Sequence, residues 1–298
     1  MSRVYEALKN AQDQRAARGS LESEAKPLEA AVAEAIHNTN AARRIPEILA
    51  AVRPDSAPAG RQLGFEELQE RCAKPGWKPK LQWTVFSSEQ SGKRQAEQFR
   101  TLRARLYGLR EARTLQTVLL TSTTMGEGKT FVALNLAQSI SRQPGRRTLL
   151  IDADLRAPKL HLALGAPSVP GLSDYLAGES DECSIIQADA HERLFFIPAG
   201  KQRSDPAELL ANNKLRALFS RLGPLFDWII VDAPPVLPIS DAGILAGMCD
   251  GVLFVVRAGM VASNLAQSAC GELKNKNLLG VVLNGVEDEA IYGPYGYY

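Results

Sequence analysis

The chain has little cysteine and no long apolar run. Its four cysteines, Cys72, Cys183, Cys249 and Cys270, are scattered and form no CxxC pair, which argues against a zinc site or a disulfide framework. No stretch reaches the ~18 uninterrupted apolar residues that a membrane span needs, and the nearest candidate, ILAGMCDGVLFVV, is split by Asp250. The first residues, MSRVYEALKNAQDQR, are polar, so we expect no signal peptide. These absences predict a cytoplasmic protein with reduced thiols.

The chain also has no large excess of positive or negative charge. The chain has 35 basic and 33 acidic residues, a net charge of +2, so nothing in its charge predicts a nucleic-acid partner. Its hydrophobic content of 45% over 298 residues is ordinary for a globular protein with a real core. The length allows one large domain or two small ones.

The first 79 residues contain little large apolar sequence. Residues 1–19 predict an amphipathic helix with Val4, Leu8 and Ala11 on one face, ended by Gly19. Residues 20–79 are rich in alanine, glutamate and proline and predict a mobile linker. Two interpretations of the first helix stay open: a solvated end that frays, or a helix that docks on a partner.

Residues 80–288 alternate between β-rich runs and helical segments. The runs QTVLLTST, RTLLIDAD, RLFFIPAG, DWIIVDAP, DGVLFVVR and LGVVLNGV are continuously apolar, which indicates strands buried on both faces of a parallel sheet. The segment DPAELLANNKLRALFSRL between two of them predicts one helix, with Asp205 as its cap, Pro206 at its first position and Glu208 completing a capping box. The pattern predicts a doubly wound α/β fold with a mostly parallel sheet flanked by helices.

The sequence TMGEGKT follows the first of these strands and precedes a helix, which is the context of a P-loop. Gly126 and Gly128 leave room for backbone N–H groups to face phosphate oxygens, and the helix N-terminus adds partial positive charge. Lys129 is placed to reach the β- and γ-phosphates, and the hydroxyl of Thr130 is placed to bind Mg²⁺. The loop therefore predicts an ATP site.

Carboxylates end two later strands. Asp152 and Asp154 end RTLLIDAD, and Asp232 ends DWIIVDAP. A single aspartate at a strand end is most often a cap or turn residue. Because ligands bind outside the carboxyl ends of such strands, all three beside Lys129 predict a magnesium–nucleotide site, with Thr130, Asp154 and Asp232 as the metal ligands.

From about residue 84 to 298 the chain resembles the bacterial tyrosine kinases of exopolysaccharide synthesis, P-loop enzymes unrelated to eukaryotic protein kinases. TSTTMGEGKT resembles the family's Walker A motif, LLIDADLRAPKLH its Walker A′ and WIIVDAPPVLPISDA its Walker B. GLSDYLAGE and DPAELLAN resemble landmarks between these motifs, and GVVLNGVE the last strand. The resemblance implies the family's fold, with ATP and Mg²⁺ as cofactors.

The resemblance also assigns residues. EQFRTLR resembles the family's ExxRxxR motif, which implies that Glu97, Arg100 and Arg103 take part in building a ring of subunits. Asp152 would orient the incoming phenol and accept its proton, since a phenol of pKa ≈ 10 is a poor nucleophile at neutral pH. The expected nucleotide-binding set is Thr124, Met125, Gly126, Glu127, Gly128, Lys129, Thr130 and Phe131, with Asn284 at the end of the last strand.

The chain departs from the family at two loop positions. Thr123 stands where the first small residue of the loop is usual, and Met125 where many members have proline. A competing resemblance is to the partitioning and cell-division-site ATPases, whose deviant Walker A carries a signature lysine that would fall at Thr124. The chain lacks that lysine and ends without an amphipathic membrane helix, which favours the kinase.

The last residues, IYGPYGYY, hold four of the chain's seven tyrosines: Tyr292, Tyr295, Tyr297 and Tyr298. The glycines and Pro294 of this segment exclude a regular helix or central strand. Residues 289–298 therefore predict a flexible tail, and the resemblance implies that its tyrosines are phosphorylated between subunits. Each phosphate adds roughly −1.5 to −2 charge, so a phosphorylated tail would repel the acidic site and the ring would come apart.

The resemblance implies partners too. MSRVYEALK is similar to the start of cytoplasmic kinases encoded apart from their membrane adaptor. We expect a protein peripheral to the inner membrane through a membrane-anchored polysaccharide co-polymerase, a cognate tyrosine phosphatase, and a homo-oligomeric ring. Two alternatives stay open: an ATP-binding scaffold that gates an export complex with little kinase activity, and a positioning ATPase.

Overall fold

The computed structural model describes residues 63–86, 93–191, 193–237 and 240–286. The predicted first helix, most of the predicted linker and the four tail tyrosines lie outside these residues. The strands of the described part form one sheet in the order β3-β4-β2-β5-β1-β6-β7. The strands are β1 (Thr117–Ser122), β2 (Thr148–Asp152), β3 (Gln187–Ala188), β4 (Leu194–Ile197), β5 (Trp228–Asp232), β6 (Gly251–Arg257) and β7 (Leu278–Asn284).

Parallel pairing joins β4, β2, β5, β1, β6 and β7, and only the two-residue β3 runs antiparallel to its neighbour β4. The six predicted strands are confirmed, and β3 is an addition. Every residue of β1, β2, β4 and β5 is buried, because helices cover both faces of the sheet. The predicted doubly wound α/β fold is confirmed.

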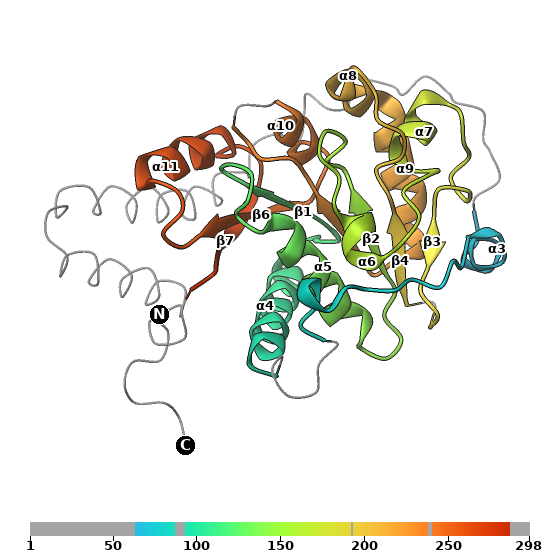
Figure 1. The fold of residues 1–298 in the computed structure, drawn as a ribbon, viewed down its shortest axis with the longest axis horizontal. Coiled ribbons are helices and arrows are strands. Elements are labelled where there is room, and N and C mark those ends of the chain that lie inside the picture. Colours follow the sequence, from blue (N-terminus) through green and yellow to red (C-terminus); the bar gives the residue numbers. More distant parts are fainter. Residues whose placement is uncertain (1–62, 87–92, 192, 238–239, 287–298) are drawn as a thin grey trace, which may run out of the picture.

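The helices form two layers (Figure 1). On one face lie α4 (Lys93–Ala112), α5 (Lys129–Ser141) and α6 (Leu160–Leu164), and on the other lie α7 (Leu172–Ala177), α8 (Pro206–Ala211), α9 (Asn213–Leu222), α10 (Asp241–Ala246) and α11 (Ser263–Glu272). Each face of the sheet has its own apolar core. In β1, Leu119 belongs to one core and Leu120 to the other, which is the alternation expected of a strand buried on both sides.

The predicted single helix over DPAELLANNKLRALFSRL, with Asp205 as its cap, is wrong. The chain forms two helices, α8 and α9, that meet at Asn212. Asn212 adopts an extended backbone with ψ 141° and its side chain accepts a hydrogen bond from the N–H of Lys214, so it caps a new helix. Asp205 and Pro206 do begin α8, but the side chain of Asp205 caps no backbone N–H.

Residues 63–79, which the sequence places in the linker, pack against the sheet in the structure. The helix α3 (Phe65–Arg71) buries Leu68 completely in the core. Ala73 then pairs with Gln187 at the β3 edge of the sheet, and the ring of Trp77 packs edge-on against Phe196. The core therefore extends to about residue 63, because this segment covers apolar surface that β3 and β4 leave open.

Replacing Leu68 with alanine should lower the free energy of unfolding by about 3 kcal/mol, because a fully buried leucine leaves a cavity when it is truncated. The matched control is Leu81→Ala in the 3₁₀ helix η3 (Leu81–Trp83), since the Leu81 side chain is 74% exposed and should change stability by less than ~0.5 kcal/mol. Urea unfolding of both variants measures the difference. Equal effects at the two positions would place residues 63–79 outside the folded core.

Candidate functional site

The loop between β1 and α5 turns sharply at two glycines. Gly126 and Gly128 have φ values of 90° and 91°, a backbone region that side chains with a Cβ atom rarely adopt. A Cβ atom at Gly128 would also lie 2.0 Å from the side-chain nitrogen of Asn284. Backbone shape therefore favours glycine at position 128, directly before the N-terminus of α5, and a larger residue would also displace the Asn284 side chain.

Lys129, the first residue of α5, meets carboxylates from two neighbouring strand ends. Its Nζ lies 2.8 Å from Asp154 Oδ2 and 3.8 Å from Asp232 Oδ1. The three side chains are only 10%, 5% and 1% exposed. They converge because β2 and β5 are adjacent, with Asp152 and Asp232 as register partners. The structure thus brings together the predicted residues of the loop and of both acidic strand ends.

Asp152 is fully buried and holds the loop that follows β2. One of its oxygens accepts hydrogen bonds from the N–H groups of Lys159 (3.2 Å) and Leu160 (3.0 Å), and the other accepts from the N–H of Asp154 (3.3 Å). These three bonds shape the loop that presents Asp154 to Lys129. The role predicted for Asp152, accepting a proton from a phenol, stays a prediction.

Burial and mutual repulsion shift the pKa values of this cluster. Burial, with Asp232 nearby, raises the pKa of Asp152 to about 8. Burial also raises the pKa of Asp232 to about 6, although Lys129 opposes the shift. Burial alone would lower the pKa of Lys129, but the charges of Asp232 and Asp154 outweigh it and raise that pKa. The cluster therefore holds more protons at neutral pH than free carboxylates would.

The donor set at this point suits a magnesium ion. Both carboxylate oxygens of Asp232 are buried without a hydrogen bond of normal geometry in the described part of the chain, although the Thr130 hydroxyl is close enough to lower the pKa of Asp232. Buried carboxylate oxygens without hydrogen bonds are costly, and a hydrated cation would satisfy those of Asp232, whose Oδ1 has, within the described residues, only the ion pair with Lys129 at 3.8 Å. Thr130, Asp154 and Asp232 offer only oxygen atoms, which Mg²⁺ prefers.

Binding of a magnesium nucleotide should release protons near pH 6, because Asp232 must be ionised to face the metal and burial raises its pKa to about 6. The raised pKa values of Asp152 and Asp232 stabilise the nucleotide-free protein at low pH, and that contribution is lost as pH rises from about 4 to the folded pKa values of about 8 and about 6. Affinity for MgADP should therefore rise with pH up to about 6, where Asp232 becomes ionised, and level off above it. Calorimetric titrations in buffers of different ionisation enthalpy measure the release, with magnesium-free ADP as the control, and equal enthalpies in all buffers would contradict it.

Two residues that sequence reasoning missed connect the site's loops. Arg156 donates two hydrogen bonds to Asp241, at 2.8 Å and 3.2 Å. Asp241 begins α10 and its side chain is 1% exposed. The pair therefore ties the loop after β2 to the helix that follows β5. A separation of 85 residues leaves no local signal of this contact.

The residues of the ExxRxxR motif make two different kinds of contact, and only Arg103 is partly buried. Glu97 and Arg100 form an exposed ion pair on α4, with N and O 2.8 Å apart. Arg103 instead donates to the backbone carbonyl of Ser139, near the end of α5. Arg103 thus binds α4 to the helix that carries the P-loop lysine. The predicted role of the three residues in a ring of subunits stays a prediction.

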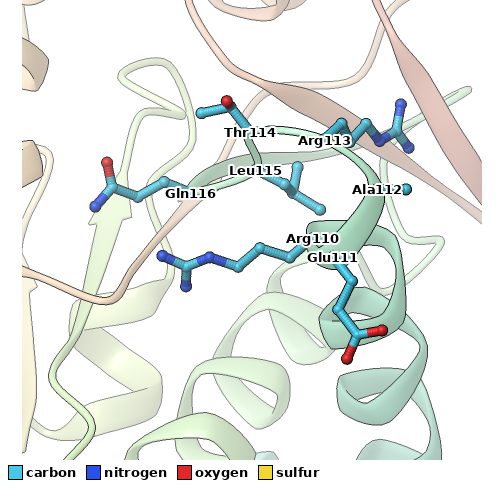
Figure 2. A pocket seen from close by; sticks show the side chains of 7 residues that line it. All are labelled: Arg110, Glu111, Ala112, Arg113, Thr114, Leu115 and Gln116. Carbon is cyan, nitrogen blue, oxygen red and sulfur yellow. The ribbon is translucent and has the colours of Figure 1, made fainter.

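A surface hollow lies at the opposite edge of the sheet, where α4 leads into β1 (Figure 2). Its two cations, Arg110 and Arg113, point away from one another. Arg110 lies over the ring of Trp228 and donates to the carbonyl of Asp227, while Arg113 donates to the side chain of Asn277. The hollow therefore presents no converging charges and lies at the other end of the strands from Lys129.

Comparison with known proteins agrees with this geometry. Residues 118–292 match the family model described as the CobQ/CobB/MinD/ParA nucleotide binding domain. Tyrosine-protein kinase YwqD of Bacillus subtilis (strain 168) is 33% identical over 222 residues, which cover 74% of this chain and 92% of that protein. Tyrosine-protein kinase CpsD of Streptococcus agalactiae is 37% identical over 183 residues, covering 60% and 80%. The chain belongs to the bacterial tyrosine-protein kinase family.

Solved structures of this tyrosine-protein kinase family support the same conclusion. The kinase domain of the Escherichia coli tyrosine kinase ETK aligns with a TM-score of 0.66 at 27% identity, covering 78% of this chain and 96% of that one. The predicted family is confirmed, and the matching domain model confirms a nucleotide-binding fold. Within the described part of the chain, no helix is long and apolar enough to cross a membrane.

Proposed function

We propose that this member of the tyrosine-protein kinase family is an ATP-dependent autokinase that phosphorylates its tail tyrosines between subunits. The observation that carries the proposal is the position of Lys129. Its ammonium group is buried at the N-terminus of α5 between Asp154 and Asp232. A lysine there can reach the β- and γ-phosphates of a bound nucleotide, and the two carboxylates can hold the accompanying metal.

Different residues of the chain bind the phosphates and the metal. The backbone amides of the loop from Gly126 onward and the ammonium group of Lys129 hold the phosphates, and Asn284 contributes from the end of β7. Thr130 and Asp154 hold Mg²⁺, with Asp232 acting through water. The metal neutralises phosphate charge when it is bound. Most of the rate would come from positioning and charge neutralisation, as is general for phosphoryl transfer.

The acceptor is the phenol of Tyr292, Tyr295, Tyr297 or Tyr298 in a neighbouring subunit. Its oxygen bonds to the γ-phosphorus while the bond from that phosphorus to the bridging oxygen of ADP breaks, and the phenolic proton passes to the ionised form of Asp152, which its pKa of about 8 makes a stronger base than a free carboxylate. The three N–H groups that hold Asp152 support this role by fixing the position of its carboxylate.

Phosphorylation would control assembly. Glu97, Arg100 and Arg103 belong to a ring of subunits in this proposal, in which unphosphorylated tails dock at neighbouring sites. Phosphates on a tail would repel one another and the acidic site, and the ring would come apart. A membrane-anchored polysaccharide co-polymerase would couple this cycle to exopolysaccharide synthesis at the inner membrane, and a tyrosine phosphatase would reset it.

Mass spectrometry of the purified chain tests the proposal. Incubation with ATP and Mg²⁺ should place phosphate on tail tyrosines, and omission of Mg²⁺ should abolish it. No phosphotyrosine under any condition, including addition of the adaptor, would favour the alternative of an ATP-binding scaffold that gates an export complex. The positioning-ATPase alternative would instead require ATP-dependent binding to DNA or to lipid vesicles.

A further inference from the structure

The phosphate loop carries a carboxylate, Glu127, between its two left-handed glycines. A negative charge in a loop that binds anions is unfavourable unless it does something else. The Glu127 side chain is fully buried and faces the protein's own backbone. Its surroundings therefore indicate what holds the loop in shape.

Both oxygens of Glu127 accept hydrogen bonds from backbone N–H groups. Oε1 accepts from Thr124 at 2.6 Å, within the loop, and Oε2 accepts from Arg257 at 3.3 Å, at the end of β6. The carbonyl of Glu127 accepts from the side chain of Asn284 at 2.9 Å, at the end of β7. One residue thus joins the start of the loop to the ends of two strands.

These contacts matter because the loop contains two glycines and would otherwise be free to take many shapes. A loop that has to be ordered when its ligand binds loses affinity, whereas one ordered in advance does not. Hydrogen bonds to a charged acceptor are about twice as strong as neutral ones. The carboxylate of Glu127 is therefore well suited to fix the loop before a nucleotide arrives.

We propose that Glu127 is a positioning residue that holds the phosphate loop in its binding shape through the N–H groups of Thr124 and Arg257. The N–H of Thr124 is then committed to this carboxylate, and the phosphate contacts fall to the amides from Gly126 onward. The inference deepens the proposed function at the same site and rests on nucleotide binding there, not on which tyrosine is phosphorylated.

Three variants at this position test whether Glu127 positions the loop through its two hydrogen-bonded oxygens. Glu127→Ala should raise the Kd for MgADP about tenfold or more, because the N–H groups of Thr124 and Arg257 lose their acceptor. Glu127→Gln should recover part of the affinity, because its oxygen can still accept from Thr124 whereas its NH₂ group accepts nothing from Arg257. Glu127→Asp keeps the charge, but its side chain is one methylene too short to reach both N–H groups. Its Kd for MgADP should therefore be as high as that of Glu127→Ala.

The measurements are calorimetric titration with MgADP and amide hydrogen exchange at Thr124 without nucleotide. Exchange at Thr124 should be slow in the wild type and fast in Glu127→Ala, and KM for ATP should change more than kcat. Glu111→Ala, an exposed substitution near the end of α4, is the control and should bind MgADP like the wild type. Wild-type affinity in Glu127→Ala, or tighter binding in both Ala and Gln variants, would overturn the proposal.

The Glu127→Asp variant keeps the test decisive if Glu127→Ala fails to fold, since wild-type affinity in the aspartate variant would also overturn the positioning role. The outcome is separable from that of the proposed function. A wild type that binds MgADP but makes no phosphotyrosine would contradict the kinase proposal, whereas the titrations would still decide the role of Glu127.

Discussion

Replacing Lys129 with methionine should abolish tail phosphorylation, with a loss of at least about a thousandfold. Lys129 is the cation that the structure places between Asp154 and Asp232 at the start of α5. Losing an electrostatic contact to the transferring group costs roughly 10²–10³ in kcat for a single donor, and Lys129 carries a full charge. The rate of phosphotyrosine formation, measured by mass spectrometry over time, checks the expectation.

The same substitution should destabilise the nucleotide-free protein. Removing one partner of a buried charge pair leaves the other charges uncompensated, at a cost of about 3–5 kcal/mol. The cost should shrink as pH falls below about 6, because burial raises the pKa of Asp232 to about 6 and this carboxylate can then take up a proton. Urea unfolding at pH 5.5 and pH 8 measures this difference.

Lys274→Met, at an exposed position after α11, is the matched control and should leave both activity and stability unchanged. Full phosphorylation in Lys129→Met would remove the lysine from the mechanism. An equal loss of stability at both pH values would show that its contacts with the buried carboxylates are not electrostatic.

Replacing all four tail tyrosines, Tyr292, Tyr295, Tyr297 and Tyr298, with phenylalanine should remove nearly all phosphotyrosine without weakening nucleotide binding. Phenylalanine keeps the ring and removes the nucleophilic oxygen, so the tail retains its size. The tail lies outside the described residues, and the prediction rests on its composition and on the family. Phosphotyrosine content and MgADP affinity of the same preparation are the two measurements.

Tyrosines inside the fold provide the control. The hydroxyl of Tyr107 is buried, and that of Tyr175 accepts a hydrogen bond from Arg221. Tyr175→Phe should therefore leave phosphorylation at the wild-type level. Persistent phosphotyrosine in the tail variant would place the acceptor elsewhere. If phosphotyrosine is lost as expected, single restorations of each tail tyrosine would rank the four as acceptors.

Sequence patterns predicted the parts of the fold whose signals are local. Continuous apolar runs located the six parallel strands, and GEGKT after a strand located the phosphate loop. Asp154 and Asp232 could be brought together because the carboxyl ends of parallel strands share one edge. The break at Asn212 was missed because asparagine is tolerated within a helix, and its capping role depends on a backbone turn that propensity alone does not reveal.

Contacts between segments far apart in the chain could not be predicted from the sequence. Arg156 and Asp241 are 85 residues apart, and Glu127 and the N–H of Arg257 are 130 apart. Glu127 was expected among the nucleotide-binding residues, but only the fold shows its side chain turned toward the ends of the strands. The burial of Leu68 was likewise hidden, because a seven-residue helix carries too little periodicity to separate it from a linker.

The central claim is transfer of phosphate from the Lys129 site of one subunit to the tail of a neighbour. Mixing two forms, neither of which can phosphorylate its own tail, tests it most directly. One is Lys129→Met with an intact tail, and the other has an intact site but ends before residue 289. With ATP and Mg²⁺, the mixture should place phosphate on the tail of the Lys129→Met chain, distinguished by its mass. No phosphate on that tail, under conditions in which the wild type is phosphorylated, would contradict transfer between subunits.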